Sequence, residues 1–155
     1  MSNQNLIEET SIFNTTALFS KDKKSRYLLK FSWDSEKKKL AIIMTFPSTA
    51  GVELLDQTTM LVRNGAVKNG FGEVAVLNLF PNINSDTPKA DKQNTSIILS
   101  ECEKADTVIV AYGRTLVLRL HKYRYFLQGI LTHHNQIYPQ VPDTSQSRLF
   151  SNQGR

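Results

Sequence analysis

Two hydroxyl side chains follow directly on an apolar run in the stretch AIIMTFPSTAG, residues 41–51. Pro47 ends the run, and Ser48, Thr49 and the small residues after them leave the backbone open to close approach. Backbone N–H groups and hydroxyls in such a loop can hold an anion or the edge of a base. No Gly-Lys-Ser/Thr sequence follows, so a Walker-type phosphate loop is excluded. A plain turn, in which Ser48 or Thr49 caps backbone groups, is the alternative and stays open.

Polar groups also stand where two later apolar segments end. Asn78 lies near the end of EVAVLNLF, residues 73–80, and a buried amide without partners there would cost about 1–3 kcal/mol. Gly113 and Arg114 follow DTVIVAY, residues 106–112, where the N–H groups of a starting helix and a guanidinium could hold a phosphate. Two alternatives stay open: an amide that only ties neighbouring loops together, and a plain turn followed by an exposed arginine.

Asp56 is the one acid close to the proposed site and could activate water if it were desolvated, but its position favours a helix N-cap. His133 and His134 are adjacent and point opposite ways in an extended chain, and no cysteine or further histidine has ligand spacing. Cys102 lies between acids in SECEKAD, which disfavours a thiolate and favours a buried, inert thiol. We therefore expect neither a metal nor a cofactor.

The net charge of +5 is unevenly placed along the chain. Basic runs at 21–26 and 37–39 favour a polyanion, although runs beside a strand or in a turn are more often simply solvated. A third basic group lies among aromatic residues in RLHKYRYF, residues 119–126, and could flank a phosphate backbone if this segment faces the site. The residues expected to contact such a backbone are Arg119, Lys122 and Arg124.

Length and composition favour one soluble domain. A chain of 155 residues buries a sufficient hydrophobic core without stabilising crosslinks, and its single cysteine suits a reducing, cytoplasmic location. No apolar run approaches the ~18 residues of a membrane span, so no membrane contact is expected. We divide the chain into a flexible N-terminal arm (1–20), a single α/β domain (21–131) and an irregular C-terminal tail (132–155), which holds a short strand at best.

The elements that would position these groups alternate between strands and helices. This alternation predicts an α/β fold: a three-layer sandwich with a mainly parallel central sheet, plus an N-terminal antiparallel hairpin strand. In such a sheet the ligand site lies at the carboxyl ends of the strands. Strands are predicted at 26–33, 40–46, 73–80 and 106–112, the first two forming the hairpin, and helices at 57–68, 95–104 and 115–127.

Several motifs taken together resemble a bacterial and phage family known as domain of unknown function 1643. These are RYLLKFSWD, FPSTAG followed by DQTT, GFGEVAVLNLFP, the later Pro88 and Asn94, and VIVAYG, which together span about residues 26–115. This chain has Phe46 where the family usually has an asparagine, and Tyr112 where it usually has a tryptophan. The segment IYPQVP is a poor counterpart of the family's closing His-Pro motif.

The organisation is also similar, more distantly, to the uracil-DNA glycosylase superfamily. That likeness implies a uracil-DNA-glycosylase-like fold, a pocket floor at 47–50, and a base read by Asn78. Phe46 can stack on a base but cannot orient water, so the likeness implies a binding pocket more readily than a working N-glycosidic hydrolase supported by Asp56. The ligand-contacting residues expected on these grounds are Phe46, Pro47, Ser48, Thr49, Asn78, Tyr112, Gly113 and Arg114.

Three functions stay open at this point. The first is a nucleic-acid or nucleotide-binding protein with a base and phosphate pocket, a divergent or inactive DNA glycosylase-like protein. The second is an enzyme acting on a small phosphorylated metabolite or nucleotide. The third is a phage- or defence-related protein-interaction module whose site has decayed, with exposed aromatic and basic residues as anchors for a protein partner.

Overall fold

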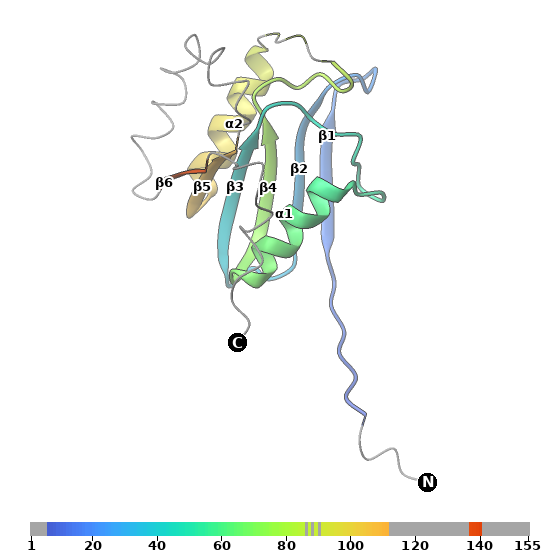
Figure 1. Ribbon diagram of the computed structural model, residues 1–155, viewed down its shortest axis with the longest axis vertical. Helices are drawn as coiled ribbons and strands as arrows, with labels where there is room; N and C mark the ends of the chain where they lie inside the picture. The colour runs from blue at the N-terminus through green and yellow to red at the C-terminus, as the bar shows by residue number, and fades with distance from the viewer. Residues whose placement is uncertain (1–5, 86, 88, 90, 112–136, 141–155) are drawn as a thin grey trace.

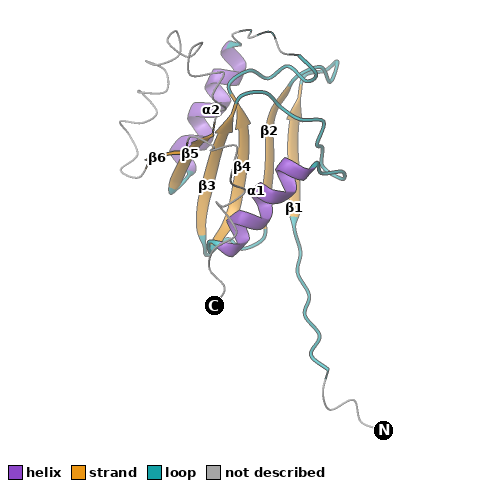
Figure 2. Ribbon diagram, viewed as in Figure 1, coloured by secondary structure: helices purple, strands orange, loops and turns teal. Residues whose placement is uncertain are grey.

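The computed structural model describes residues 6–85, 87, 89 and 91–111 together with the backbone of 137–140 (Figure 1). These residues form one six-stranded sheet and two helices (Figure 2). None of the described helices is long and apolar enough to cross a membrane. In chain order the elements are β1 (Asn14–Phe19), β2 (Arg26–Ser32), β3 (Lys38–Met44), α1 (Gln57–Lys68), β4 (Phe71–Asn78), α2 (Lys92–Lys104), β5 (Thr107–Ala111) and β6 (Ile137–Gln140).

The sheet is mixed, and its strand order is β1-β2-β4-β3-β5-β6. β1 pairs with β2 and β2 pairs with β4, both antiparallel. β3 is parallel to β4 and to β5, and β5 is parallel to β6. The α/β class is confirmed. The predicted mainly parallel central sheet with one hairpin strand, uracil-DNA-glycosylase-like, is wrong, because the N-terminal half of the sheet is antiparallel.

The predicted hairpin of 26–33 with 40–46 is also wrong, because β4 lies between β2 and β3. The connection from β2 to β3 must therefore pass the start of β4, and it does so at Gly72. The Gly72 carbonyl accepts hydrogen bonds from the backbone N–H groups of Trp33 (2.9 Å) and Asp34 (3.1 Å). A β-carbon on Gly72 would lie 1.9 Å from the Asp34 carbonyl oxygen, so only glycine fits beneath this crossing.

The core consists of two layers, one on each face of the sheet. Consecutive residues of β4 alternate between them: Val74 and Val76 belong to the layer beneath α1, and Ala75 and Leu77 to the layer beneath α2. Strands covered on both faces read as continuous apolar runs, which explains the lack of alternation in the sequence. The helices contribute Val62 and Ala66 from α1, and Ile98 and Cys102 from α2.

Helix α1 has the boundaries that its sequence predicts. Asp56 is the N-cap, with its carboxylate accepting from the backbone N–H of Thr59 at 2.7 Å. Gly70, just beyond the C-cap, has φ 76°, a conformation that glycine adopts at little cost. Helix α2 begins three residues earlier than predicted, since Asp91 caps it by accepting from the N–H of Asn94.

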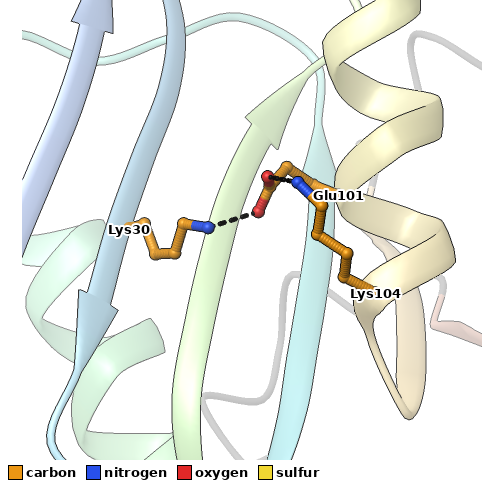
Figure 3. A network of polar contacts seen from close by, with 3 residues as sticks. All are labelled: Lys30, Glu101 and Lys104. Carbon is orange, nitrogen blue, oxygen red and sulfur yellow. Dashed lines mark hydrogen bonds and ion pairs between the residues drawn. The ribbon is translucent and has the colours of Figure 1, made fainter.

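Helix α2 is tied to the sheet by a buried carboxylate. Glu101 accepts from Lys30 of β2 at 2.7 Å and from Lys104 at 2.9 Å (Figure 3). Burial alone would raise the pKa of Glu101, but the hydrogen bonds from the two ammonium groups hold it below its ordinary value. The neighbouring Cys102 thiol is buried and free, as the sequence predicts, and burial with the nearby acids raises its pKa to about 12.

The segment predicted as an N-terminal arm, residues 1–20, contains the edge strand β1. Its side chains alternate between exposed and half-buried, as expected for a strand covered on one face. In the segment predicted as an irregular tail, Ile137–Gln140 form β6 alongside β5. The helix predicted for 115–127 lies outside the described residues.

Candidate site at the carboxyl edge of the sheet

Three segments meet at the edge where β3 and β4 end, at the top of Figure 1. We call this the carboxyl edge, and it comprises Arg26 and residues 45–56 and 79–85. Because β2 is antiparallel to β4, its first residue, Arg26, also lies here. The backbone N–H of Arg26 donates to the Pro81 carbonyl at 2.8 Å, which fixes the start of β2 to the loop after β4.

Arg26 is the centre of this edge, and none of its surface is exposed. Its Nη1 donates to the carbonyl oxygen of Ala50 at 2.7 Å and to that of Ser48 at 3.4 Å. Its Nη2 donates to Oδ1 of Asn78 at 3.4 Å. One guanidinium thus joins the loop after β3 to the last residue of β4.

The charge of Arg26 is not neutralised by a direct partner. All three acceptors are neutral, and no described carboxylate forms an ion pair with the guanidinium. Burial lowers the pKa of Arg26, and the nearby Asp56 charge offsets only part of this shift. The guanidinium nevertheless stays protonated, as arginine does in proteins. Its Nε has no hydrogen-bond partner among the described residues. The carboxyl edge therefore contains a buried cation with one unused donor.

Asn78, expected to bind a ligand, lies against this cation and is 1% exposed. A guanidinium only donates hydrogen bonds, so the Asn78 oxygen must face Arg26 and its Nδ2 must point away. Nδ2 has no partner within the described part of the chain. The loop-tying role considered for Asn78 belongs to Asn94, whose Nδ2 donates to the carbonyls of Asn78 (2.9 Å) and Leu79 (3.1 Å). Oδ1 of Asn94 is buried and, among described groups, unpaired.

The loop after β3 turns two of its carbonyls inward, toward Arg26. Pro47 is buried, Ser48 is half-buried and Thr49 is exposed. The Ser48 hydroxyl accepts from the N–H of Ala50 at 3.4 Å, which is the capping role of the plain-turn interpretation. In a trans peptide the carbonyl and the following N–H point in opposite directions, so the N–H of Thr49 points away from the guanidinium.

Phe46 lies in this loop, two residues before Ser48. Its ring is half-buried and lies 5.2 Å from the ring of Phe80, centroid to centroid, with the planes tilted by 35°. It packs against the core layer beneath α2. The ring is therefore held in one orientation next to the carboxyl edge.

Asp56 is confirmed as the N-cap of α1, and its suggested catalytic role stays a prediction. Burial would raise its pKa, but hydrogen bonds from Ser48 and Thr59 and the charge of Arg26 hold the pKa below its ordinary value. A carboxylate with a lowered pKa is a weak proton acceptor near neutral pH. Asp56 is thus better suited to fixing the loop and helix than to activating water.

Sequence reasoning missed Arg26, which stands in the basic run 21–26 and was expected to be solvated with it. The lysines of this run are exposed, but Arg26 is the first residue of an apolar strand, RYLLKFS. That position was the only signal of burial available in the sequence. The other expected site residues, Tyr112, Gly113, Arg114, Arg119, Lys122 and Arg124, lie outside the described residues, as do His133 and His134.

Comparison with known proteins identifies the family. Neither a search of curated proteins nor a search of solved structures finds a match. The distant likeness to uracil-DNA glycosylases and the bacterial or phage origin therefore gain no support. A family model described as "Protein of unknown function (DUF1643)" matches residues 26–147, which is most of the chain and confirms the first resemblance. The match begins at Arg26 and includes every described residue of the site from there on, and the chain belongs to the DUF1643 family.

Proposed function

We propose that this protein binds a nucleotide, either free or as part of a nucleic acid, at the carboxyl edge of β3 and β4. The observation that carries the proposal is the buried Arg26. Its hydrogen-bond acceptors are all neutral, the nearby Asp56 makes no direct ion pair with it, and its Nε has no partner among the described residues. Burying a charge without an ionic partner is costly, so an anion near this edge would be favoured.

The size of the effect is sufficient for recognition. A phosphate about 6 Å from the guanidinium would gain about 3 kcal/mol at an effective dielectric constant of about 20. Because 1.4 kcal/mol corresponds to a factor of ten in affinity, this attraction alone would strengthen binding by roughly 100-fold. The anion need not displace the carbonyls of Ser48 and Ala50, since the attraction acts through space.

The groups around Arg26 suit a base better than a plain phosphorylated sugar. Nδ2 of Asn78, beside Arg26, is an unused donor among the described residues, and the acceptors of a base edge are suitable partners for it. The half-buried ring of Phe46, two residues before Ser48 in the same loop, offers an aromatic surface for stacking. The Asp56 carboxylate is already engaged as the N-cap of α1, which leaves it a structural role beside a binding site.

The test is isothermal titration calorimetry of the purified protein with the four nucleoside monophosphates, the matching nucleosides, and ribose 5-phosphate. We compare the wild type with Arg26→Met and with a control, Arg63→Met, which removes a half-buried arginine of α1. Circular dichroism establishes that each variant is folded. Arg26→Lys keeps the positive charge but lacks the planar guanidinium that donates several hydrogen bonds at once. It replaces Arg26→Met in the test if Arg26→Met does not fold.

We expect at least one nucleotide to bind, with affinity reduced by roughly 100-fold in Arg26→Met and little changed in Arg63→Met. Equal binding of nucleotide by wild type and a folded Arg26→Met would refute the role of Arg26. Equal affinity for ribose 5-phosphate and for the nucleotides would refute the claim that the site recognises a base. If none of the ligands binds, the proposal fails as a whole.

A further inference from the structure

The turn between β1 and β2 carries three exposed lysines beside the candidate site. Lys21, Lys23 and Lys24 lie in residues 20–25, which we call the lysine turn. Its one acid, Asp22, accepts hydrogen bonds from Ser20 Oγ (2.6 Å) and from the backbone N–H of Lys24 (3.1 Å). None of the ion pairs between described residues involves these lysines. The turn therefore presents a net positive charge to solvent.

The lysine turn is held in one conformation and fixed to the carboxyl edge. Within it, the N–H of Ser20 donates to the Ser25 carbonyl, and that of Lys23 to the Ser20 carbonyl, each at 2.9 Å. The Lys24 carbonyl accepts from the N–H of Ile83, in the loop that follows Asn78, at 2.9 Å. Figure 1 shows this turn at the same end of the molecule as the loops after β3 and β4.

We infer that the ligand of the carboxyl edge is a single-stranded nucleic acid whose backbone runs across the lysine turn. This inference rests on the proposed function and names its ligand class. Lys24 is two residues before Arg26, so their α-carbons are at most about 7 Å apart. A strand with one nucleotide at Arg26 thus brings its neighbouring phosphates over the exposed ammonium groups. A free mononucleotide has no such neighbours.

A single strand fits this edge better than other polyanions do. The unused Nδ2 of Asn78 and the aromatic ring of Phe46 suit a base, which a polyphosphate or a lipid headgroup lacks. In a duplex the bases are stacked and paired, so reading one would require flipping it out at a cost of a few kcal/mol. The lysines supply affinity through counterion release, independent of sequence.

Lys23 allows charge and stability to be separated. Its φ is 55°, a left-handed conformation that costs a non-glycine residue about 1 kcal/mol. Its Nζ lies 5.9 Å from the centroid of the Phe19 ring, which positions the ammonium. Replacing Lys23 with glycine relieves the backbone strain and removes one charge. We therefore expect Lys23→Gly to raise the unfolding temperature while it weakens binding of a strand.

The experiment measures fluorescence anisotropy of labelled 12-nucleotide single strands, DNA and RNA, between 50 and 200 mM KCl. The test variant carries K21Q, K23Q and K24Q. The control carries K37Q, K38Q and K39Q, which removes the same charge at the opposite end of β3. Duplex DNA, polyphosphate and vesicles containing phosphatidylserine are titrated in parallel, and a nucleoside monophosphate reports on binding at the carboxyl edge alone.

Each backbone contact to a single strand contributes about 0.7 to the slope of log affinity against log salt, so three contacts contribute about 2. Over this fourfold range of salt the wild type should lose about 20-fold more affinity than the test variant, and the control should behave as the wild type. Binding of the monophosphate should be unchanged in the test variant.

The outcomes separate this inference from the proposed function. If a monophosphate binds through Arg26 but test and control variants have equal salt slopes, the inference is overturned and the proposed function stands. Tighter binding of duplex, polyphosphate or vesicles than of single strands also overturns it. If neither monophosphate nor strand binds, both proposals fail together.

Discussion

Replacing Gly72 with alanine tests the crossing that separates β2 from β3. The new β-carbon would lie 1.9 Å from the Asp34 carbonyl oxygen and 2.9 Å from both the Asp34 carbonyl carbon and the Lys37 β-carbon. Relieving the first clash requires the two backbones to move apart by about 1 Å, which is overpacking against main chain and costs about 1–3 kcal/mol. That shift also strains the hydrogen bonds from Trp33 and Asp34 to the Gly72 carbonyl, worth about 1 kcal/mol each.

We therefore expect Gly72→Ala to lower the free energy of unfolding by about 3–5 kcal/mol, a large part of the stability of an ordinary domain. Urea denaturation followed by circular dichroism measures the change. Gly51→Ala is the matched control, since a β-carbon there meets nothing within 4 Å, and its effect should stay within about 1 kcal/mol. A Gly72→Ala protein within 1 kcal/mol of the wild type would refute the crossing, and with it the placement of β4 between β2 and β3.

Three further predictions concern single side chains. Asp56→Ala should lower the free energy of unfolding by about 1–2 kcal/mol through loss of the N-cap, and a thermal melt identical to that of the wild type would contradict the cap. The pKa of Glu101 lies below its ordinary 4.5, so its stabilisation is present above about pH 4.5 and is lost as the pH falls through the lowered pKa. The stability gap between wild type and Glu101→Gln should thus shrink from pH 6 to pH 3 in urea titrations, and a constant gap would argue against the paired carboxylate. Cys102, with its pKa raised to about 12, should react with a thiol reagent at pH 8 far more slowly in the folded protein than in urea, and equal rates would contradict its burial.

The sequence was informative about elements that depend on local chemistry. The cap at Asp56 and the glycine at position 70 bound α1 correctly, and the continuous apolar run of 40–44 correctly predicted a strand covered on both faces. The start of α2 was missed because Asp91 follows a polar loop in which several residues are plausible caps. Helix caps and strand burial of this kind are determined by residues within a few positions of each other in the sequence.

Strand pairing and the buried charge depend on residues far apart in the chain. An apolar run shows that a strand is covered but not which strand lies beside it, so the sequence alone pairs β2 with the next strand along the chain. Gly72 is the one local residue that reflects the true strand order. Its requirement for glycine is evident only once the Asp34 carbonyl is known to lie against it. The burial of Arg26 likewise depends on carbonyls 22 and 24 residues away and on Asn78, 52 residues away.

The insertion of β4 between two earlier strands also constrains how the chain folds as it is synthesised. β1 and β2 can form a local hairpin early, but β2 keeps one open backbone edge until β4 has emerged. Both edges of β3 stay open until then, and one of them stays open until β5 has emerged. Strand pairing between residues far apart in the sequence lowers the folding rate, because the entropic cost of loop closure comes before the favourable contacts form. Until residue 78 is available, two apolar strands remain exposed to pairing with other chains. The nascent protein is therefore most vulnerable to aggregation in the interval between the synthesis of β3 and that of β4.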